Sequence, residues 1–332
     1  MANSVKKQHI LGLVMISLTA VFWGAGFVLI DQLLDSTFSD TPSLFLAVRF
    51  SVAALMLAVI FNKKLRFNKY ILLYGGVGGL FIFAGFLLQT IGLKYTTPSH
   101  NGFFTAAYVM FIPFITWIAY KKCPRWITFV GVGVAVAGLV LLNFDGNSTK
   151  TDKMWLGDLL TILCAVMFAL QIFWTDYSLK KNKIDNVQLT FWQVAVAAIL
   201  FVLYTVIFES KHYASLELAN LKYDWWRLII VTLGGTAFAY FAQTYAQMRL
   251  SPTETSLIMA CESPIGAFLS MILLVEPFSW QTIGGGALVI VAVILVEVVP
   301  TIHLKPRKQV EPNSNGEENT TTQEVDVDTK EE

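Results

Sequence analysis

The chain has 332 residues, of which 55% are hydrophobic and only 14% are charged. Soluble domains carry about a quarter charged residues, so this composition excludes an ordinary soluble enzyme and predicts an all-α integral membrane protein. The net charge of +1, with no basic stripe outside the membrane flanks, argues against a nucleic-acid partner.

Ten apolar runs reach the length of about 20 residues that a helix needs to cross a bilayer. The first run is too long for the apolar region of a signal peptide, so we interpret it as an uncleaved span. The breaks at 95–98 and 249–252 are the weakest, and each ends in a proline, which disfavours a helical residue before it. The predicted transmembrane helices are residues 10–30, 42–61, 70–93, 99–119, 126–143, 156–179, 187–208, 226–248, 253–274 and 280–299.

Positive charge predicts the orientation of these spans. With a cytoplasmic N-terminus, the inner segments hold sixteen Lys and Arg residues and the outer segments hold six. Cytoplasmic loops are enriched in such residues, so we expect both termini in the cytoplasm and the protein in the plasma (inner) membrane. The tail, 309–332, has eight acids and no aromatic residue, so we expect it to be disordered.

The two halves of the chain resemble each other. Residues 11–21 match 156–166 at a spacing of 145, and ten identical pairs recur at a spacing of 154, among them Gln89 with Gln243 and Trp126 with Trp280. We therefore predict two repeats, 10–143 and 156–299, of five helices each. Because five is odd, the second repeat enters the membrane from the opposite side, as in many secondary transporters.

Two ionisable residues stand out inside the predicted spans. Glu262 lies about nine residues into the ninth span, which is about 14 Å deep, and Arg49 lies about seven residues into the second. Charged groups at such depth are costly and usually face the bundle interior. We expect the two side chains to pair or to share a substrate-binding cavity. A fixed ion pair that only holds helices together is the alternative.

The repeat spacing extends this site. Tyr108 corresponds to Glu262, so we expect it to face the same cavity, while His100 and Glu254 correspond and should lie near opposite mouths as gating or proton-relay candidates. An interfacial role is the alternative for His100. Pro264 removes a backbone donor and predicts a kink that serves gating.

Further substrate-binding candidates are polar or aromatic residues deep in apolar spans. A buried amide needs partners, so each glutamine either faces the cavity or joins helices. Trp23 either stacks on a substrate or fills the bundle. The glycine runs 75–79 and 284–286 favour close helix packing over phosphate binding. The candidates are Trp23, Gln89, Gln171, Trp192 and Gln243.

Several short motifs follow one another along the chain. They are Phe22–Gly24, Arg49–Phe50, Thr105–Pro113, and Glu262 and Pro264 followed by Glu276 and Pro277. Their order resembles the EamA-type family of the drug/metabolite transporter superfamily, over about residues 10–299. The resemblance implies a ten-helix carrier of small metabolites, such as an exporter of amino acids. Here the acid of the ninth span stands one residue further from the proline than in the common family pattern.

These observations favour a secondary carrier that works by alternating access. Its partners are a small-molecule substrate and the lipid bilayer, and a homodimer is a candidate assembly. A lipid flippase or scramblase with a groove open to lipid is the main alternative, and an intramembrane enzyme is a weaker one. The sequence has no H-E-x-x-H motif, no paired metal ligands and no Walker loop. We therefore expect no enzymatic activity, no metal site and no cofactor.

Overall fold

The computed structural model describes residues 2–96, 98–142, 153–216, 218–273 and 280–297. Every regular element in these ranges is a helix, and seven continuous helices are long and apolar enough to cross a membrane. Shorter apolar helices lie within α6 and α13. This confirms the all-helical class, while the count of ten spans stays a prediction.

The helices follow the order of the predicted spans. The first half contains α1 (Ala2–Asp35), α2 (Pro42–Phe61), α3 (Lys69–Leu93), α4 (Pro98–Ala106), α5 (Tyr108–Tyr120) and α6 (Trp126–Leu142). The second half contains α7 (Met154–Asp176), η1 (Tyr177–Lys181), α8 (Asn186–Phe208), η2 (Ser210–Ser215), η3 (Leu218–Asn220), α9 (Leu221–Ile229), η4 (Ile230–Phe238), α10 (Ala239–Gln247), α11 (Pro252–Met259), α12 (Glu262–Ile272) and α13 (Trp280–Glu297).

Two predicted spans are broken in the middle, and the sequence pattern predicts only one of these breaks, as a kink at Pro264. The fourth divides into α4 and α5 at Ala107, and the ninth divides into α11 and α12 at Ala260 and Cys261. Pro264 has no N–H to donate to the carbonyl of Ala260, and Ser263 N donates to that carbonyl instead, at 3.2 Å. The predicted kink is therefore a complete break, and it lies 154 positions after its counterpart at Ala107.

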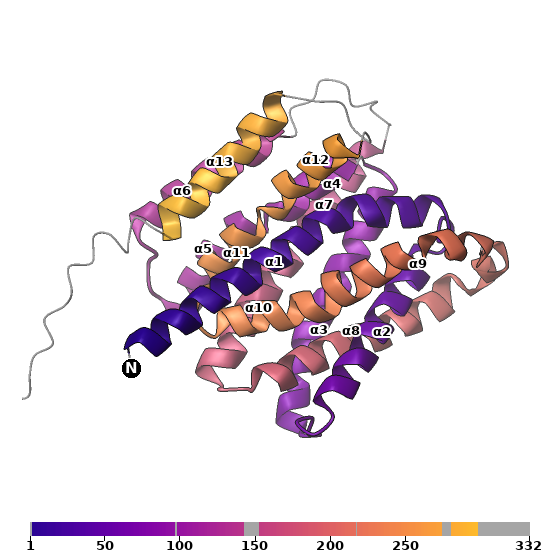
Figure 1. Cartoon of the computed structure of the whole chain (residues 1–332), viewed down its shortest axis with the longest axis horizontal. Coiled ribbons are helices and arrows are strands. Elements are labelled where there is room, and N and C mark those ends of the chain that lie inside the picture. Colours follow the sequence, from indigo (N-terminus) through magenta and orange to yellow (C-terminus); the bar gives the residue numbers. More distant parts are fainter. Residues whose placement is uncertain (1, 97, 143–152, 217, 274–279, 298–332) are drawn as a thin grey trace, which may run out of the picture.

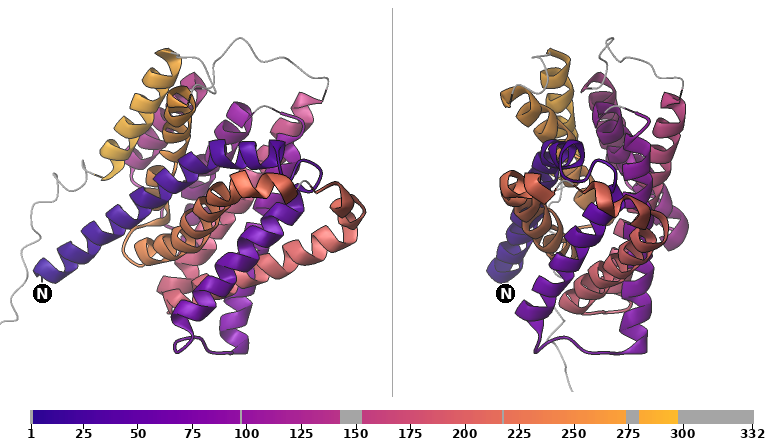
Figure 2. Two further views of the ribbon diagram at one scale, coloured as in Figure 1. Left: turned by 45° about the vertical axis from the view of Figure 1, so that its right-hand side comes forward. Right: turned by 90° about the vertical axis from the view of Figure 1, so that its right-hand side faces the viewer.

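The helices pack into one bundle in which α1 runs diagonally across the molecule (Figure 1). Helices α6 and α13 lie side by side along one edge, and α2, α3 and α8 form the opposite part of the bundle (Figures 1 and 2). Helix α1 packs on α10 and α12, whereas α7 packs on α3, α4 and α5.

The buried side chains form two large apolar clusters. One contains Tyr108 and residues of α5, α6, α11 and α13, and the other contains Phe50 and residues of α2, α3, α8 and η4. Trp23 of α1 and Phe168 of α7 pack against both clusters. The space between the two clusters is where the cavity described below is found.

Glycines allow α3 to approach α8 closely, as the sequence predicts. A methyl group added at Gly79 would lie 2.6 Å from the carbonyl oxygen of Gln193, and one added at Gly78 would lie 2.7 Å from the Gln193 side chain. A methyl group at Gly76 would meet nothing within 4 Å. Within the run 75–79, the glycines that face α8 therefore need to lack a side chain, whereas Gly76 does not.

Candidate functional site

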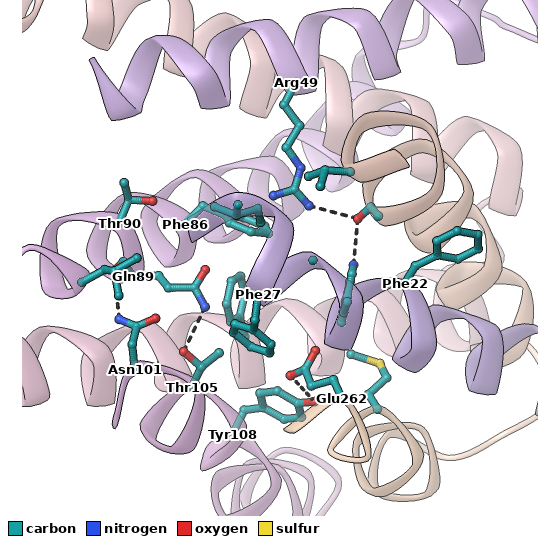
Figure 3. A pocket seen from close by; sticks show the side chains of 18 of the residues that line it. Phe22, Phe27, Arg49, Phe86, Gln89, Thr90, Asn101, Thr105, Tyr108 and Glu262 are labelled. Atoms are coloured by element: carbon teal, nitrogen blue, oxygen red, sulfur yellow. Dashed lines mark hydrogen bonds between the residues drawn. The ribbon is translucent and has the colours of Figure 1, made fainter. Parts of the chain in front are cut away.

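A cavity lies between the two apolar clusters and has an empty volume of about 940 Å³, which includes space open to the surroundings. Helices from both halves of the chain line it, and Figure 3 shows its polar groups arranged around a central aromatic wall. The aromatic lining residues are Phe22, Trp23, Phe27, Phe86, Phe168 and Tyr240. The polar ones include Asp31, Arg49, Gln89, Thr90, Asn101, Thr105, Tyr108, Gln171 and Glu262.

Glu262 and Tyr108 meet at the two helix breaks. Tyr108 is the first residue of α5 and Glu262 is the first residue of α12, and both are almost fully buried. The Tyr108 hydroxyl donates to Glu262 Oε1 at 3.1 Å (Figure 3). The positive end of the α12 dipole also favours a carboxylate at this position. Equivalent positions of the two halves thus form a direct hydrogen bond inside the cavity.

Arg49 lines the same cavity but bonds to neutral groups. Its Nε donates to Thr236 Oγ1 at 2.6 Å, and its Nη2 donates to the carbonyl oxygen of Gly235 at 3.1 Å. The guanidinium also lies over the ring of Phe86, 5.0 Å from its centre. The expectation of an Arg49–Glu262 ion pair is therefore wrong in this structure, whereas the two residues do share one cavity.

The groups that hold Arg49 come from η4, a stretch of π-helix that the sequence analysis missed. A π turn contains an extra residue, so the hydroxyl of Thr236 donates to the carbonyl of Val231 at 3.2 Å, five positions back. Trp23 Nε1 donates to the carbonyl of Gly235 at 2.8 Å, beside Arg49. The adjacent Gly234, Gly235 and Thr236 inside an apolar span are the only sequence signal of this feature.

Amide and hydroxyl groups cover another wall of the cavity. Gln89 Nε2 donates to Thr105 Oγ1 at 3.0 Å, and Asn101 Nδ2 donates to the backbone carbonyl of Gln89 at 3.0 Å. Asn101 also lies 3.0 Å from Thr161 Oγ1 of α7. Asn101 and Thr105 are one turn apart on α4. Two polar residues one turn apart in an apolar span are a sequence pattern that predicts a polar helix face.

Gln171 connects the cavity to a buried network of amides. Its Oε1 accepts from Gln243 Nε2 at 3.0 Å, and its Nε2 donates to Gln193 Oε1 at 3.0 Å and to Thr175 Oγ1 at 3.1 Å. Gln243 itself has no exposed surface and is not among the lining residues. Gln243 therefore joins α10 to α7, as the alternative interpretation of the glutamines predicts.

Three other candidates lie apart from the cavity. Trp192 packs against Phe67 near one end of the bundle, so its assignment to the cavity is wrong. Glu254 accepts a hydrogen bond from Ser251 N at 2.7 Å in a capping box at the start of α11. The Pro264 ring adjoins the helix break. The side chain of His100 lies outside the described residues, as do Glu276, Pro277 and the tail.

The two ends of the cavity differ. Toward the C-terminal ends of α1 and α3 its lining extends to Asp31, Leu34 and Leu93. At the other end Lys180 forms an ion pair with Asp176 at 2.5 Å and donates to the carbonyl of Leu250 at 2.6 Å. The Tyr120 hydroxyl donates to the same aspartate at 3.0 Å. These bonds tie α5, α7, η1 and the segment after α10 together.

Comparisons with known proteins agree with this architecture. An uncharacterized transporter of Archaeoglobus fulgidus is 29% identical over 300 residues, which cover 90% of this chain and 88% of that protein. A biotin transporter of Escherichia coli is 22% identical over 305 residues, covering 91% of this chain and 95% of that one. A solved crystal structure with 15% identity superposes with a TM-score of 0.71 over 88% of this chain and 99% of its own, so it has the same fold.

The family model described as the EamA-like transporter family matches residues 10–144 and again residues 155–298. The two matches together cover nearly the whole helical part of the chain. Together with the long apolar helices, they establish that this chain is a multi-pass membrane protein that belongs to the EamA-like transporter family.

Proposed function

We propose that the protein is a secondary carrier that moves small metabolites across the plasma membrane by alternating access. The observation that carries the proposal is the internal cavity, which contains a buried acid and a buried arginine between two apolar clusters. Such residues are costly in a membrane protein and usually mark a substrate or ion pathway. The family resemblance favours export, with amino acids or related metabolites as cargo.

The helix contacts support an inverted repeat. In the predicted repeat α1 corresponds to α7, α2 to α8, α3 to η4 and α10, α4–α5 to α11–α12, and α6 to α13. Helix α1 packs on α10 and α12, and its counterpart α7 packs on the corresponding helices α3 and α5. Helices α2 and α8 pack on each other, as do α6 and α13. Each contact thus has a counterpart, which is expected when two halves are related by a twofold axis.

The difference between the two ends of the cavity supports alternating access. In the orientation that positive charge predicts, Asp31 and Leu93 lie toward the outside, and Asp176 and Lys180 lie toward the cytoplasm. Asp31 and Asp176 are equivalent in the predicted repeat. Rocking of one half against the other would separate α5 of the first half from α7 of the second, where the Tyr120 hydroxyl bonds to Asp176, and would release the substrate on the cytoplasmic side.

The test is counterflow in proteoliposomes loaded with a mixed pool of metabolites. The native chain is expected to exchange one class of compound, and Glu262→Gln is expected to lose that exchange because it removes the cavity's central acid. Glu254→Gln is the matched control, since glutamine also completes a capping box and Glu254 lies outside the cavity. If no solute is exchanged and fluorescent lipid moves between leaflets instead, lipid translocation replaces the carrier proposal.

A further inference from the structure

We infer that Arg49 binds the carboxylate of the transported solute, so that the substrates are small molecules with a single negative charge at one end. The inference rests on the proposed carrier function, because it concerns what fills the same cavity. Its basis is the set of hydrogen bonds that the guanidinium makes and the composition of the cavity around it.

One of the three nitrogens of Arg49 has no acceptor. The residue is 2% exposed, and Nη1 has no hydrogen-bond partner among the described residues. Arg49 lines the cavity, and in Figure 3 this nitrogen points away from the guanidinium's dashed hydrogen bond, to the side where Phe86 lies. An arginine stays charged in proteins, and a charged donor without an acceptor is costly inside a protein. The molecule that occupies the cavity is therefore the natural source of the acceptor.

The charge of Arg49 is also unbalanced. Its bonded partners, the Thr236 hydroxyl and the Gly235 carbonyl, are neutral. These two bonds, together with the Phe86 ring below, hold the guanidinium in one orientation before a ligand arrives. Guanidinium groups bind carboxylates with well-defined geometry, and a fixed group loses little entropy on binding.

The two acids that line the cavity do not prevent Arg49 from binding a carboxylate. Glu262 accepts the Tyr108 hydroxyl and lies at the positive end of α12, so part of its charge is already balanced. Asp31 lies further along α1, near the C-terminal end of that helix. Neither acid forms an ion pair with Arg49, whose bonds go to η4.

The residues that line the cavity also limit which kind of anion can bind there. Among the described residues that line the cavity, Arg49 is the only Lys or Arg, and one fixed cation matches a singly charged carboxylate better than a doubly charged phosphate. Next to Arg49 the wall consists of the rings of Phe86, Trp23 and Tyr240, with amides of Gln89 and Asn101 beyond. The rest of the solute is therefore expected to have an apolar or aromatic part and a polar group that bonds to amides.

The experiment compares each acid with its own primary amide as a competitor in counterflow. The probes are phenylalanine and phenylalaninamide, and biotin and biotin amide. The native chain should prefer each acid by at least tenfold. Arg49→Gln should bring the acid-to-amide ratio close to one, whereas Arg249→Lys should leave it unchanged. Arg249 is a matched control, because it also bonds to a carbonyl, that of Tyr245, and stacks on the Tyr245 ring, yet lies outside the cavity.

Thr236→Val tests whether the preference for acids depends on the charge of Arg49 or on its hydrogen bond to Thr236. The variant removes one of the two neutral partners of Arg49 and keeps the charge. This variant should retain the preference for acids even if its exchange is slower. Equal exchange of acids and amides by the native chain, or an equal loss of both in Arg49→Gln, would overturn the role of Arg49 and leave the carrier proposal standing. Absence of any solute exchange by the native chain would overturn both.

Discussion

Replacing Gly79 with alanine tests how tightly α3 and α8 pack beside the site. The added methyl group would lie 2.6 Å from the carbonyl oxygen of Gln193 and 2.9 Å from Cβ of Val196. Ordinary contacts begin near 3.4 Å. A backbone carbonyl has no rotamer through which to move away, so the two helices must separate by roughly 0.8 Å near this point.

Two opposing effects determine how much Gly79→Ala changes the free energy of unfolding. Overpacking of this kind costs about 1–3 kcal/mol, while alanine in place of glycine in a helix gains about 0.5–1 kcal/mol. We expect Gly79→Ala to lose about 1 kcal/mol of unfolding free energy, which is the difference between the middles of these two ranges, and at most about 2.5 kcal/mol. Gly76→Ala, one turn earlier and with open space around it, should gain about 0.5–1 kcal/mol because only the second effect remains.

Thermal unfolding of the two variants in the same detergent measures this difference. For 332 residues, an unfolding entropy of about 2.1 cal/mol/K per residue gives roughly 1–2 °C per kcal/mol, so the midpoints should move in opposite directions by about 1–2 °C. Because Gln193 bonds to Gln171 in the cavity wall, Gly79→Ala should also slow solute exchange, and Gly76→Ala should not. Equal or raised midpoints for both variants would refute the close contact between α3 and α8.

Two further changes test other parts of the molecule. Asp224→Asn should lower the unfolding free energy by about 1.5–3 kcal/mol, because the buried carboxylate accepts from Ser36 and Thr37 and pairs with Arg227. Calorimetry with the exposed Asp40→Asn as control checks this, and an equal effect of both would contradict it. Tyr120→Phe removes the hydroxyl that donates to Asp176 and so joins α5 of the first half to α7 of the second, and the cytoplasmic end should therefore open about tenfold more often. Thr175→Cys, buried near that end, should then react faster with a thiol reagent from the cytoplasmic side, and an unchanged rate would count against a closure at Tyr120.

The parts of the site that depend on the repeat could be predicted, and those that depend on local helix geometry could not. The spacing of 154 predicts that Tyr108 faces the cavity of Glu262, because equivalent residues near a twofold axis come close to each other. The partners of Arg49 depend on the π turn in η4, whose extra residue changes which side chains of α9 to α10 face α2. No residue pattern of period 3.6 contains that information.

Trp192 is another residue whose position depends on local helix geometry that the sequence does not reveal. Trp192 and its neighbour Gln193 are both unusual in an apolar span, and the sequence alone does not decide which one faces the interior. Successive residues of an α-helix point about 100° apart, so only one of them can do so. The structure places Gln193, with no exposed surface, in the amide network, and Trp192 against Phe67 near the helix end.

The two charged residues of the site break the symmetry that the repeat imposes on the helices. Glu262 corresponds to Tyr108 at a spacing of 154, and Arg49 corresponds to Val194 at the spacing of 145 that relates the first helices. The acid therefore belongs to the second half and the arginine to the first, while their counterparts are uncharged. In a carrier whose halves rock about the cavity, Arg49 and Glu262 remain attached to α2 and α12 in both states. A solute whose carboxylate binds Arg49 would then keep one orientation relative to the two halves during transport, although the cavity opens first to one side and then to the other.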